Sequence, residues 1–426
     1  MTHVESPRRP RVVVVGGGFG GLSVVRGLRD TDVDITLVDR HTFNTFQPLL
    51  YQVATGSLNP GDITWFLRAV RSRQPNVQFV QGSVGGIQHS ARQIQLDDGR
   101  RLSFDYLVLA TGVTANFFGT PGAAEHSMPL YTREQALALR DRVFAGLEDA
   151  AANHRDRDLR MIIVGGGPTG VETAGALAEM RNKDIPVIYP ELDPRRVHVT
   201  LVEMAPHLLA SFKPASRAYA ASSLRRIGVD LRLNTTVLRV EPEGAVVGQG
   251  DVIPAATVVW ASGVIARAEV AGWGLPQRDG GRIAVDHHLR VKDHDRVFAV
   301  GDAAIGDGVL ALPQLAQPAV QGGRHVAAFI RADVLGQVID PLRYKDKGIL
   351  ATIGRSSAVA EVAHLPRLQG FPAWMIWNAV HVATLLGGRN RMSTMANLTT
   401  KHLAWNHTHN AIVGHTHAPT QQSAAS

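Results

Sequence analysis

The feature that most constrains this chain is an internal repeat. The segment VVVVGGGFGG (Val12–Gly21) recurs as MIIVGGGPTG (Met161–Gly170), 149 residues later. The run YLVLATG, which ends at Gly112, recurs as TVVWASG, which ends at Gly263, 151 residues later. Two similar units therefore follow one another, and each has a strand, a glycine-rich turn, a helix and a closing strand. Because VFAVGDAA (Val297–Ala304) has no partner at the end of the first unit, the second unit is predicted to be inserted into the first.

Each glycine-rich turn has the spacing G-x-G-x-x-G between an apolar strand and a helix. The first glycine permits a tight turn, the second lets a pyrophosphate approach the backbone, and the third lets the helix pack on the strand. The pyrophosphate then lies at the positive end of the helix. A lone turn of this kind could be a loop without function. Here a strand, a glycine-rich turn, a helix and a later acid follow one another in this order in both units. This repetition favours two dinucleotide sites.

The acids that complete the pattern are Asp39 in the first unit and Glu203 in the second. Asp39 follows Gly21 by 18 residues, and Glu203 follows Gly170 by 33 because a polar insert intervenes. A carboxylate at this position hydrogen-bonds an adenosine ribose and repels a 2′-phosphate. Since no arginine follows Glu203 in residues 204–212, the second unit is predicted to prefer NADH to NADPH.

The amino-acid composition excludes several types of reaction and of metal site. With 426 residues, 45% of them hydrophobic, the chain can bury two or three domain cores. The absence of cysteine removes redox disulfides, thiolate nucleophiles and cysteine-ligated metals. The polar residues 1–10 run directly into a strand, so no secretory signal is expected. Four histidines near the C-terminus (His407, His409, His415 and His417) are interpreted as part of a disordered tail rather than a metal site, and no metal is expected.

The net charge of +7 is concentrated near the C-terminus. Residues 341–426 hold eight Lys or Arg and two acidic residues, so the first 340 residues are nearly neutral. The apolar segment Ala373–Gly387 has Trp374 and Trp377, but it is shorter than the roughly 20 residues that span a bilayer. A buried core helix is one interpretation. The polar stripe of Asn378, His381 and Thr384, followed by Arg389 and Arg391, favours a helix that lies on an anionic membrane surface.

The two repeated units, the strand end at Ala110–Gly112 and the late VFAVGDAA resemble the flavoproteins with two dinucleotide-binding domains. This resemblance covers residues 11–330. It implies that the first unit binds FAD, that the second binds the nicotinamide cofactor, and that Asp302 contacts the ribityl chain or a phosphate of the flavin. Asp302 would also serve as a helix N-cap. Glutathione-reductase-like and sulfide:quinone enzymes share this layout but need thiols that this chain lacks.

Further segments resemble the type II NADH:quinone oxidoreductases, the single-subunit NADH dehydrogenases that do not pump protons. They are FQPLLYQVATG (Phe46–Gly56), LAQPAVQGG (Leu315–Gly323) and YKDKGILATIGRSSAV (Tyr344–Val359). The resemblance implies that Ala316, Gln317 and Gln321 line a quinone pocket. It also implies that Glu172 assists quinone binding or protonation. From the residues alone, Gln317 could belong to an ordinary helix, and Glu172 could be a first-turn acid kept as a carboxylate by the helix dipole.

The predicted fold is therefore α/β, with two nested Rossmann-like dinucleotide-binding domains and a C-terminal membrane-associating segment. The predicted parts are an N-terminal arm (1–10), an FAD domain (11–120 and 290–340), an NADH domain (121–289), a membrane-surface segment (341–405) and a tail (406–426). The expected catalytic residues are Glu172, Gln317 and Gln321. The expected cofactor-binding residues are Gly16, Gly18, Phe19, Gly20, Gly21, Asp39, Arg40, Ala110, Thr111, Gly112, Gly301, Asp302, Ala316 and Gln317 for the first unit. For the second unit they are Gly165, Gly167, Thr169, Gly170, Glu203, Ser262 and Gly263.

The expected reaction is hydride transfer from NADH to FAD, followed by transfer of two electrons to a membrane quinone, either menaquinone or ubiquinone. The expected location is the cytoplasmic side of the cell membrane, as a peripheral protein and a possible homodimer. One alternative is a soluble NADH-dependent reductase for a protein or small-molecule acceptor, which would not need the basic C-terminal segment. Another is a flavoprotein resembling apoptosis-inducing factor that binds nucleic acid. The position of the basic residues beside apolar ones argues against nucleic acid.

Overall fold

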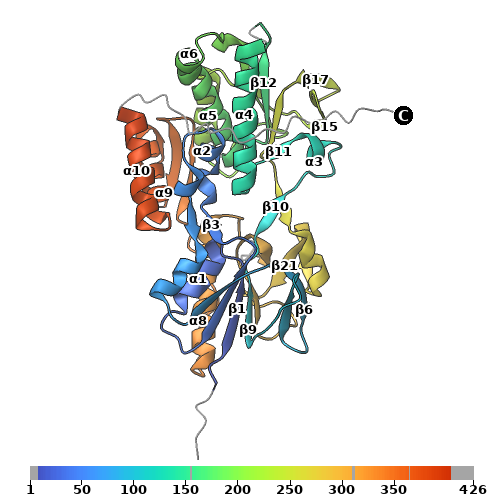
Figure 1. Cartoon of the computed structure of the whole chain (residues 1–426), viewed down its shortest axis with the longest axis vertical. Coiled ribbons are helices and arrows are strands. Elements are labelled where there is room, and N and C mark those ends of the chain that lie inside the picture. Colours follow the sequence, from blue (N-terminus) through green and yellow to red (C-terminus); the bar gives the residue numbers. More distant parts are fainter. Residues whose placement is uncertain (1–7, 154–155, 309–311, 364, 404–426) are drawn as a thin grey trace, which may run out of the picture. The chain divides into compact units, whose positions relative to one another are not determined.

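The structure is a computed structural model that describes residues 8–153, 156–308, 312–363 and 365–403. The chain forms two compact units (Figure 1). The first unit consists of Met1–Asn44, Trp65–Thr114 and Val264–Lys347, and the second of Thr45–Thr64, Ala115–Gly263 and Gly348–Ser426. The chain thus passes between the units several times. The predicted α/β fold is confirmed, whereas the predicted domain limits stay a prediction.

The first unit is built on a five-stranded parallel sheet in the order β22, β9, β1, β2, β5. The strands are β1 (Arg11–Val15), β2 (Asp34–Asp39), β5 (Val77–Gln81), β9 (Tyr106–Leu109) and β22 (Val297–Ala299). Val12 to Val15 and all four residues of β9 are buried. Continuous apolar runs of this kind are typical of parallel strands covered on both faces.

Helices α1 (Phe19–Gly27) and α8 (Ala316–Val334) pack against each other in this unit. Their close approach depends on Gly27, where a Cβ would lie 2.6 Å from the Cβ of Ala327. Two small sheets complete the unit: β6 (Val84–Gln88), β7 (Gln93–Leu96) and β8 (Arg101–Ser103), and β20 (Gln277–Arg278), β21 (Arg282–Val285) and β23 (Ala304–Gly306).

The second unit repeats this sheet in the order β11, β18, β12, β13, β14, again with parallel neighbours. The strands are β11 (Met128–Pro129), β12 (Leu159–Val164), β13 (Val197–Val202), β14 (Asp230–Arg232) and β18 (Thr257–Trp260). Strands β12, β13, β14 and β18 occupy the places that β1, β2, β5 and β9 hold in the first sheet. The repeat seen in the sequence is therefore a repeat of topology. The edge differs, because the first sheet ends in the late strand β22.

The helices of the second unit are α4 (Arg133–Asn153), α5 (Pro168–Glu179) and α7 (Pro214–Arg226), with the short α3 (Ala123–His126) and α6 (Ile185–Ile188). An antiparallel sheet of β15 (Val237–Glu241), β16 (Gly244–Val247) and β17 (Asp251–Pro254) follows β14. Four short strands, β3 (Phe43–Thr45), β4 (Thr64–Phe66), β10 (Val113–Ala115) and β19 (Val264–Ala266), lie at or next to the places where the chain passes between the units.

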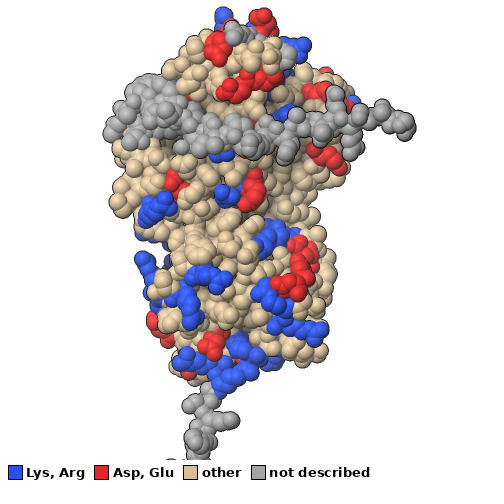
Figure 2. Space-filling model, in the orientation of Figure 1, with Lys and Arg blue, Asp and Glu red and all other residues tan. Residues whose placement is uncertain are grey.

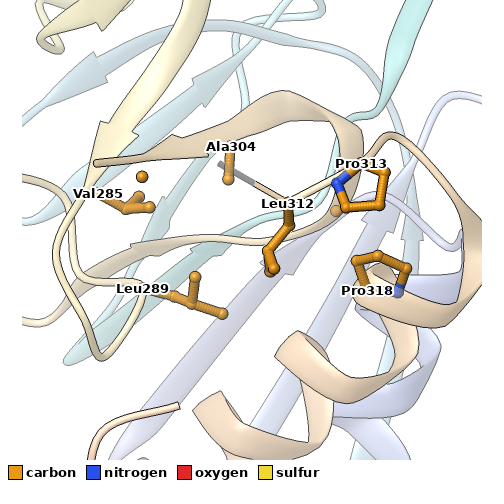
Figure 3. A pocket seen from close by; sticks show the side chains of 8 residues that line it. Val285, Leu289, Ala304, Leu312, Pro313 and Pro318 are labelled. Atoms are coloured by element: carbon orange, nitrogen blue, oxygen red, sulfur yellow. The ribbon is translucent and has the colours of Figure 1, made fainter. Parts of the chain in front are cut away.

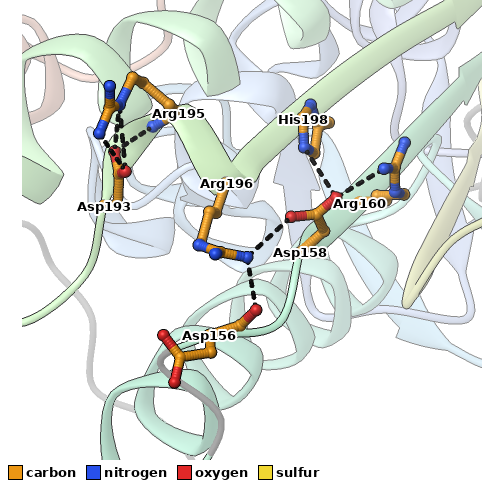
Figure 4. A network of polar contacts seen from close by, with 7 residues as sticks. All are labelled: Asp156, Asp158, Arg160, Asp193, Arg195, Arg196 and His198. Atoms are coloured by element: carbon orange, nitrogen blue, oxygen red, sulfur yellow. Dashed lines mark hydrogen bonds and ion pairs between the residues drawn. The ribbon is translucent and has the colours of Figure 1, made fainter.

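The polar insert of the second unit returns to the sheet through a cluster of charged side chains (Figure 4). Asp158, directly before β12, pairs with Arg160 at 2.6 Å, with Arg196 at 3.6 Å and with His198 of β13 at 3.3 Å. Arg195 pairs separately with Asp193 at 2.8 Å. Because these groups are accessible to solvent, each pair adds little stability, and the cluster mainly fixes where the insert rejoins β13.

The C-terminal segment belongs to the second unit. It forms the antiparallel strands β24 (Gly348–Thr352), β25 (Ala358–Val362) and β26 (Leu368–Gly370), then the helices α9 (Phe371–Thr384) and α10 (Gly388–Leu403). Strand β24 packs on α5, and so does the short helix α2 (Leu50–Ala54). Within the described ranges, no helix has both the length and the apolar character needed to cross a membrane. The four terminal histidines lie outside the described residues.

Basic side chains are not confined to the C-terminal segment. On the face seen in Figure 2, Lys and Arg side chains gather over the first unit. Within the first unit, Arg40 pairs with Glu269 and Arg296 pairs with Asp333. The near-neutral charge of residues 1–340 therefore reflects local pairing of opposite charges rather than a lack of them.

Candidate functional site

The first glycine-rich turn lies at the carboxyl end of β1, directly before α1. Gly16 has φ +105° and donates its backbone N–H to Val38 O at 2.7 Å, which ties the turn to β2. A Cβ at Gly16 would lie 2.3 Å from Ala110 O, so only glycine fits there. In contrast, a Cβ at Gly18 would meet nothing within 4 Å. The backbone at Gly18 is thus open, as a pyrophosphate at the start of α1 requires.

The second turn repeats this geometry at the end of β12. Gly165 has φ +109° and donates to Val202 O at 2.9 Å, and a Cβ there would lie 2.7 Å from Ala261 O. At Gly167 a Cβ would again meet nothing within 4 Å. Helix α5 begins at Pro168, so the open backbone faces a helix N-terminus as in the first unit. Both turns therefore fit a dinucleotide pyrophosphate.

The two predicted ribose acids are held by the glycine-rich turns themselves. Asp39 Oδ2 accepts a hydrogen bond from Gly17 N at 2.6 Å, and its Oδ1 accepts from His41 N at 2.8 Å. Glu203 Oε2 accepts from Gly166 N at 2.5 Å, and its Oε1 accepts from Ala205 N at 2.7 Å. Each carboxylate is therefore fixed at the carboxyl edge of its sheet, next to the turn. This holds although the number of residues between turn and acid differs between the two units.

The strand ends singled out in the sequence lie at the same edges. Ala110 N donates to Val15 O at 2.7 Å, which brings Thr111 and Gly112 next to the first turn. The Thr111 hydroxyl oxygen is buried and has no partner among the described residues. A buried polar atom without a partner is costly unless a ligand or water meets it. Thr111 therefore fits the presence of a polar cofactor in the first unit.

The VFAVGDAA segment continues the first sheet, since Val300 N donates to Leu109 O at 2.9 Å. Asp302 follows at once, and its carbonyl oxygen accepts from Arg282 Nε at 3.1 Å and from Gln314 Nε2 at 3.4 Å. The predicted N-cap role of its side chain is not seen, because Asp302 lies inside the short 3₁₀ helix Gly301–Ala303, whose N-cap is Val300. The turn at Gly301 and Asp302 thus connects β22 to β23.

A small pocket lies beside this motif and is lined by apolar side chains (Figure 3). Its volume is about 20 Å³, enough for a water molecule but not for a dinucleotide. The pocket is lined by Val285, Leu289, Gly301, Ala304, Gly306, Leu312, Pro313 and Pro318. It is therefore a packing defect beneath the motif rather than the cofactor site.

The two glutamines predicted to meet the acceptor both lie on α8 of the first unit. Gln321 is fully engaged by the chain, because its Nε2 donates to Lys345 O at 2.8 Å and its Oε1 accepts from Lys345 N at 3.0 Å. Gln317 is partly exposed, and its side chain makes no hydrogen bond within the described ranges. The side chain of Gln317 is consequently free to contact a ligand, whereas that of Gln321 holds the backbone at Lys345. Of the other predicted residues, Arg40 pairs with Glu269.

Glu172 lies on α5 and is buried, with 7% of its surface exposed. It accepts hydrogen bonds from the backbone N–H of Thr352 at 3.1 Å and from the side chain of Trp377. Burial nevertheless raises the pKa of Glu172 to about 8. The expectation that the helix dipole keeps this acid charged is therefore wrong. Glu172 is the fifth residue of α5, beyond the first turn, and desolvation outweighs the dipole there.

Comparisons with known proteins agree with this geometry. Residues 10–323 match the family model of the pyridine nucleotide-disulphide oxidoreductases, and residues 347–405 match the NDH2 C-terminal domain. The chain is 35% identical over 418 residues to a type II NADH:quinone oxidoreductase of Mycobacterium tuberculosis, covering 94% of this chain and 89% of the relative. A second such enzyme of that organism is 36% identical over 91% of this chain and 86% of its own length.

This chain is a type II NADH:quinone oxidoreductase by family. Its fold is also that of NDH2 from Plasmodium falciparum, solved in complex with NADH, with a TM-score of 0.84. That structure is 18% identical and covers 93% of this chain and 99% of the solved chain. The protein is accordingly an oxidoreductase.

The sequence missed the residues that surround Glu172 in this oxidoreductase. They are Tyr51 and Gln52 of α2, Thr352 of β24 and Trp377 of α9. Tyr51 and Thr352 are 301 positions apart, so no local pattern could have joined them. The only available signal was the family resemblance of the segments Phe46–Gly56 and Tyr344–Val359, which between them contain Tyr51, Gln52 and Thr352.

Helix α9 corrects one further expectation. Trp377 was expected to lie in a helix on the membrane surface, but it is only 1% exposed, and so is Leu385 at the end of the helix. The ring of Trp377 stacks on that of His381 with centroids 4.0 Å apart. The large apolar residues of α9 that are exposed are Phe371, Met375 and Val380.

Proposed function

We propose that this protein oxidises NADH and passes two electrons to a membrane quinone, with FAD as the carrier between them. The observation that carries the proposal is the duplicated turn, in which Gly18 and Gly167 leave the backbone open beside a fixed carboxylate. Two open turns fit two dinucleotides, and the family to which the chain belongs is named for NADH and quinone. The chain's own residues bind and orient, whereas FAD supplies the two-electron chemistry when it is bound.

Each unit has a distinct part in this proposal. In the first unit, Gly18, Asp39 and Thr111 would hold FAD through pyrophosphate, ribose and a buried hydroxyl. In the second unit, Gly167 and Glu203 would hold NADH in the same manner. Gln317 is proposed to orient the quinone. Glu172 is proposed to hold a proton, because a neutral acid at neutral pH can donate one.

The acceptor separates this proposal from a soluble reductase. Purified protein should show an FAD spectrum that NADH bleaches and that either menaquinone or ubiquinone analogues restore. A protein acceptor such as a ferredoxin should restore it far more slowly. The relatives do not favour the soluble alternative, since the NDH2 C-terminal domain is matched over residues 347–405. Rapid turnover with a ferredoxin and none with quinones would reverse this choice.

The outer face of α9 and α10 is proposed as a membrane-binding surface. Phe371, Met375 and Val380 on α9 are 49%, 52% and 38% exposed, and Met392 and Met395 on α10 are 70% and 57% exposed. Burying such side chains gains about 25 cal/mol per Å² of apolar surface. Arg389 and Arg391 are exposed at the start of α10, where they could contact anionic headgroups.

The polar stripe of α9 does not oppose this proposal. Asn378 Nδ2 donates to Trp374 O at 2.8 Å, His381 Nδ1 bonds to Trp377 O at 2.6 Å, and Thr384 Oγ1 donates to Val380 O at 2.7 Å. Because each side chain makes a hydrogen bond to the helix one turn before it, the stripe would bring fewer unpaired polar atoms into an apolar layer. Asn378 Oδ1 alone of these side-chain oxygens is buried without a partner among the described residues. A location on the cytoplasmic side and a homodimer also stay predictions. Protease accessibility in oriented vesicles and sedimentation of the purified protein would test them.

A further inference from the structure

Glu172 stands at the end of a hydrogen-bonded chain that crosses three segments of the second unit. Gln52 Nε2 donates to Tyr51 Oη at 2.9 Å, and Tyr51 Oη bonds to Thr352 Oγ1 at 2.9 Å. Thr352 Oγ1 in turn donates to Glu172 Oε1 at 3.4 Å. All four residues are buried, so water does not compete for these groups.

Gln52, at the far end of these linked hydrogen bonds, fixes the direction in which each of them is donated. The amide nitrogen of Gln52 can only donate, so the Tyr51 oxygen accepts there and its proton is left to point at Thr352. The Thr352 hydroxyl, having accepted, then donates to Glu172. Hydrogen bonds aligned in one direction polarise and strengthen one another. The chain therefore delivers a hydrogen bond that favours the ionised form of Glu172.

Trp377 and the backbone of Thr352 supply two more donors, so the carboxyl group has three donors and no cation. No ion pair involves Glu172 in the described parts of the chain, and its pKa is set by burial against these hydrogen bonds. The other titratable groups nearby are not opposite charges for it. Burial raises the pKa of Tyr51 and lowers that of His381 on α9 to about 4, so both are neutral near pH 7.

Along the same face of α5, burial also raises the pKa of Glu179, which accepts a hydrogen bond from the backbone of Arg355. The Arg355 side chain reaches Asp184 at 4.0 Å. The two cations of this region, Arg355 and Lys183, both act electrostatically on Glu179, two turns away from Glu172, and neither contributes to the pKa shift of Glu172. What remains to stabilise a Glu172 carboxylate is the set of neutral donors.

The proton balance of the reaction gives these donors a purpose. NADH supplies a hydride, that is two electrons and one proton, and forming a quinol from a quinone takes one proton more. If Glu172 gives that proton, it becomes a buried carboxylate until water returns a proton to it. Without donors, a carboxylate at this depth would be too costly to form. With too many hydrogen-bond donors, Glu172 would stay ionised and would have no proton to give.

We propose that Thr352, with Tyr51 behind it, and Trp377 are positioning residues that let Glu172 give up and regain this proton. They act through Glu172 and need not touch the quinone. The inference rests on the proposed function for its reaction, but the protonation of Glu172 can be measured without turnover.

The decisive variant is Thr352→Val, which keeps the shape and the backbone donor but removes the hydroxyl. We expect the infrared carbonyl band that Glu172→Gln abolishes to titrate about one pH unit higher in Thr352→Val holoenzyme than in wild type, the shift expected on losing one hydrogen bond to a carboxylate. The alkaline limb of quinone reduction should move upward with it, because the protonated acid is the active form. Thr352→Ser should restore both midpoints.

Two further variants complete the test. Tyr51→Phe should shift the midpoint upward by less, since it leaves the Thr352 donor in place. Thr394→Val is the matched control, because Thr394 is a fully buried threonine on α10 whose hydroxyl has no partner among the described residues. Its midpoint should equal that of wild type.

The outcomes separate the two proposals. A Thr352→Val midpoint equal to wild type, or an equal shift in Thr394→Val, overturns the positioning role even when quinone turnover is normal. An infrared shift as expected in a protein that reduces no quinone at any pH supports the positioning of the acid and overturns the proposed function.

Discussion

Glu203 accepts a hydrogen bond from the backbone of Gly166 at 2.5 Å, so the acid proposed to select the nucleotide is held by the turn proposed to bind its pyrophosphate. The same relationship joins Asp39 to Gly17 at 2.6 Å in the other unit. Sheet order, turn and acid are thus duplicated together. Because the two units are equivalent in this respect, a substitution in one unit has the corresponding substitution in the other unit as its matched control.

Glu203→Gln should lower the ratio of catalytic efficiency with NADH to that with NADPH, because it removes the negative charge that repels a 2′-phosphate. The glutamine oxygen can still accept from Gly166, so the turn should keep its shape. Steady-state kcat/KM values with both nucleotides measure the ratio. Asp39→Asn is the control and should leave it unchanged. A constant ratio in Glu203→Gln would mean that another residue selects against the 2′-phosphate.

Gly18→Val should yield folded but colourless protein. The structure leaves room for a Cβ at Gly18, so the side chain would occupy the place of the pyrophosphate without disturbing the fold. The absorbance spectrum of purified protein measures retained FAD, and circular dichroism checks the fold. Gly167→Val should keep its FAD but lose bleaching by NADH. Stoichiometric FAD in Gly18→Val would overturn the assignment of the first turn.

Reduction of the flavin by NADH and its oxidation by quinone should respond differently to substitutions at the two residues proposed to act on the quinone. Gln317→Ala and Glu172→Gln should slow the oxidation of reduced flavin by quinone about tenfold or more, as loss of an acid catalyst or an orienting group does. Bleaching by NADH should stay fast, because neither residue belongs to the turn proposed to hold NADH. Stopped-flow absorbance resolves the two phases. Slow reduction with normal reoxidation would show that these roles were assigned to the wrong substrate.

The stability of the protein should depend on pH through Glu172. Its pKa in the folded chain, about 8, lies above the ordinary value of 4.5, so the neutral acid contributes stability that is present below pH 4.5 and lost as pH rises to 8. The difference is on the order of a few kcal/mol. Glu172→Gln removes this dependence. The Tm of wild type relative to the variant should therefore fall between pH 5 and pH 8, and a constant difference would mean that Glu172 is not a neutral buried acid.

The sequence predicted the parts of the site that lie within short stretches of chain. The glycines, Asp39 and Glu203 could be predicted to lie together because strand, turn and acid follow one another in each unit, and the structure places each acid beside its turn. Thr352 and Tyr51 could not be found, because their hydrogen bond joins distant segments. The expected direction of the pKa shift of Glu172 was wrong, since the helix position is visible in a sequence and the burial is not.

Helix α9 shows the same limit for surfaces. Apart from its polar stripe it is apolar, so the sequence could not tell which of its apolar residues face the core. Trp377 was expected at the membrane surface but is buried, whereas Met375, which the sequence analysis did not single out, is half exposed. Truncation before Pro372 would therefore also remove the Trp377 contact to Glu172. A test of the membrane surface has to change only the outer residues.

The double substitution Met375→Asp and Met392→Asp meets this requirement, since both side chains are exposed, at 52% and 70%. It should release the protein from anionic lipid vesicles, because two charges replace apolar surface that would enter the lipid. Val252→Asp on β17 is the matched control, as Val252 is an apolar residue of the same unit with 62% exposure. Co-sedimentation with vesicles measures binding. Activity toward a long-tailed quinone should fall with binding, while activity toward a short water-soluble quinone should not, because only the former must be taken from the bilayer. Equal release by Val252→Asp, or full binding by the double variant, would place the membrane contact elsewhere.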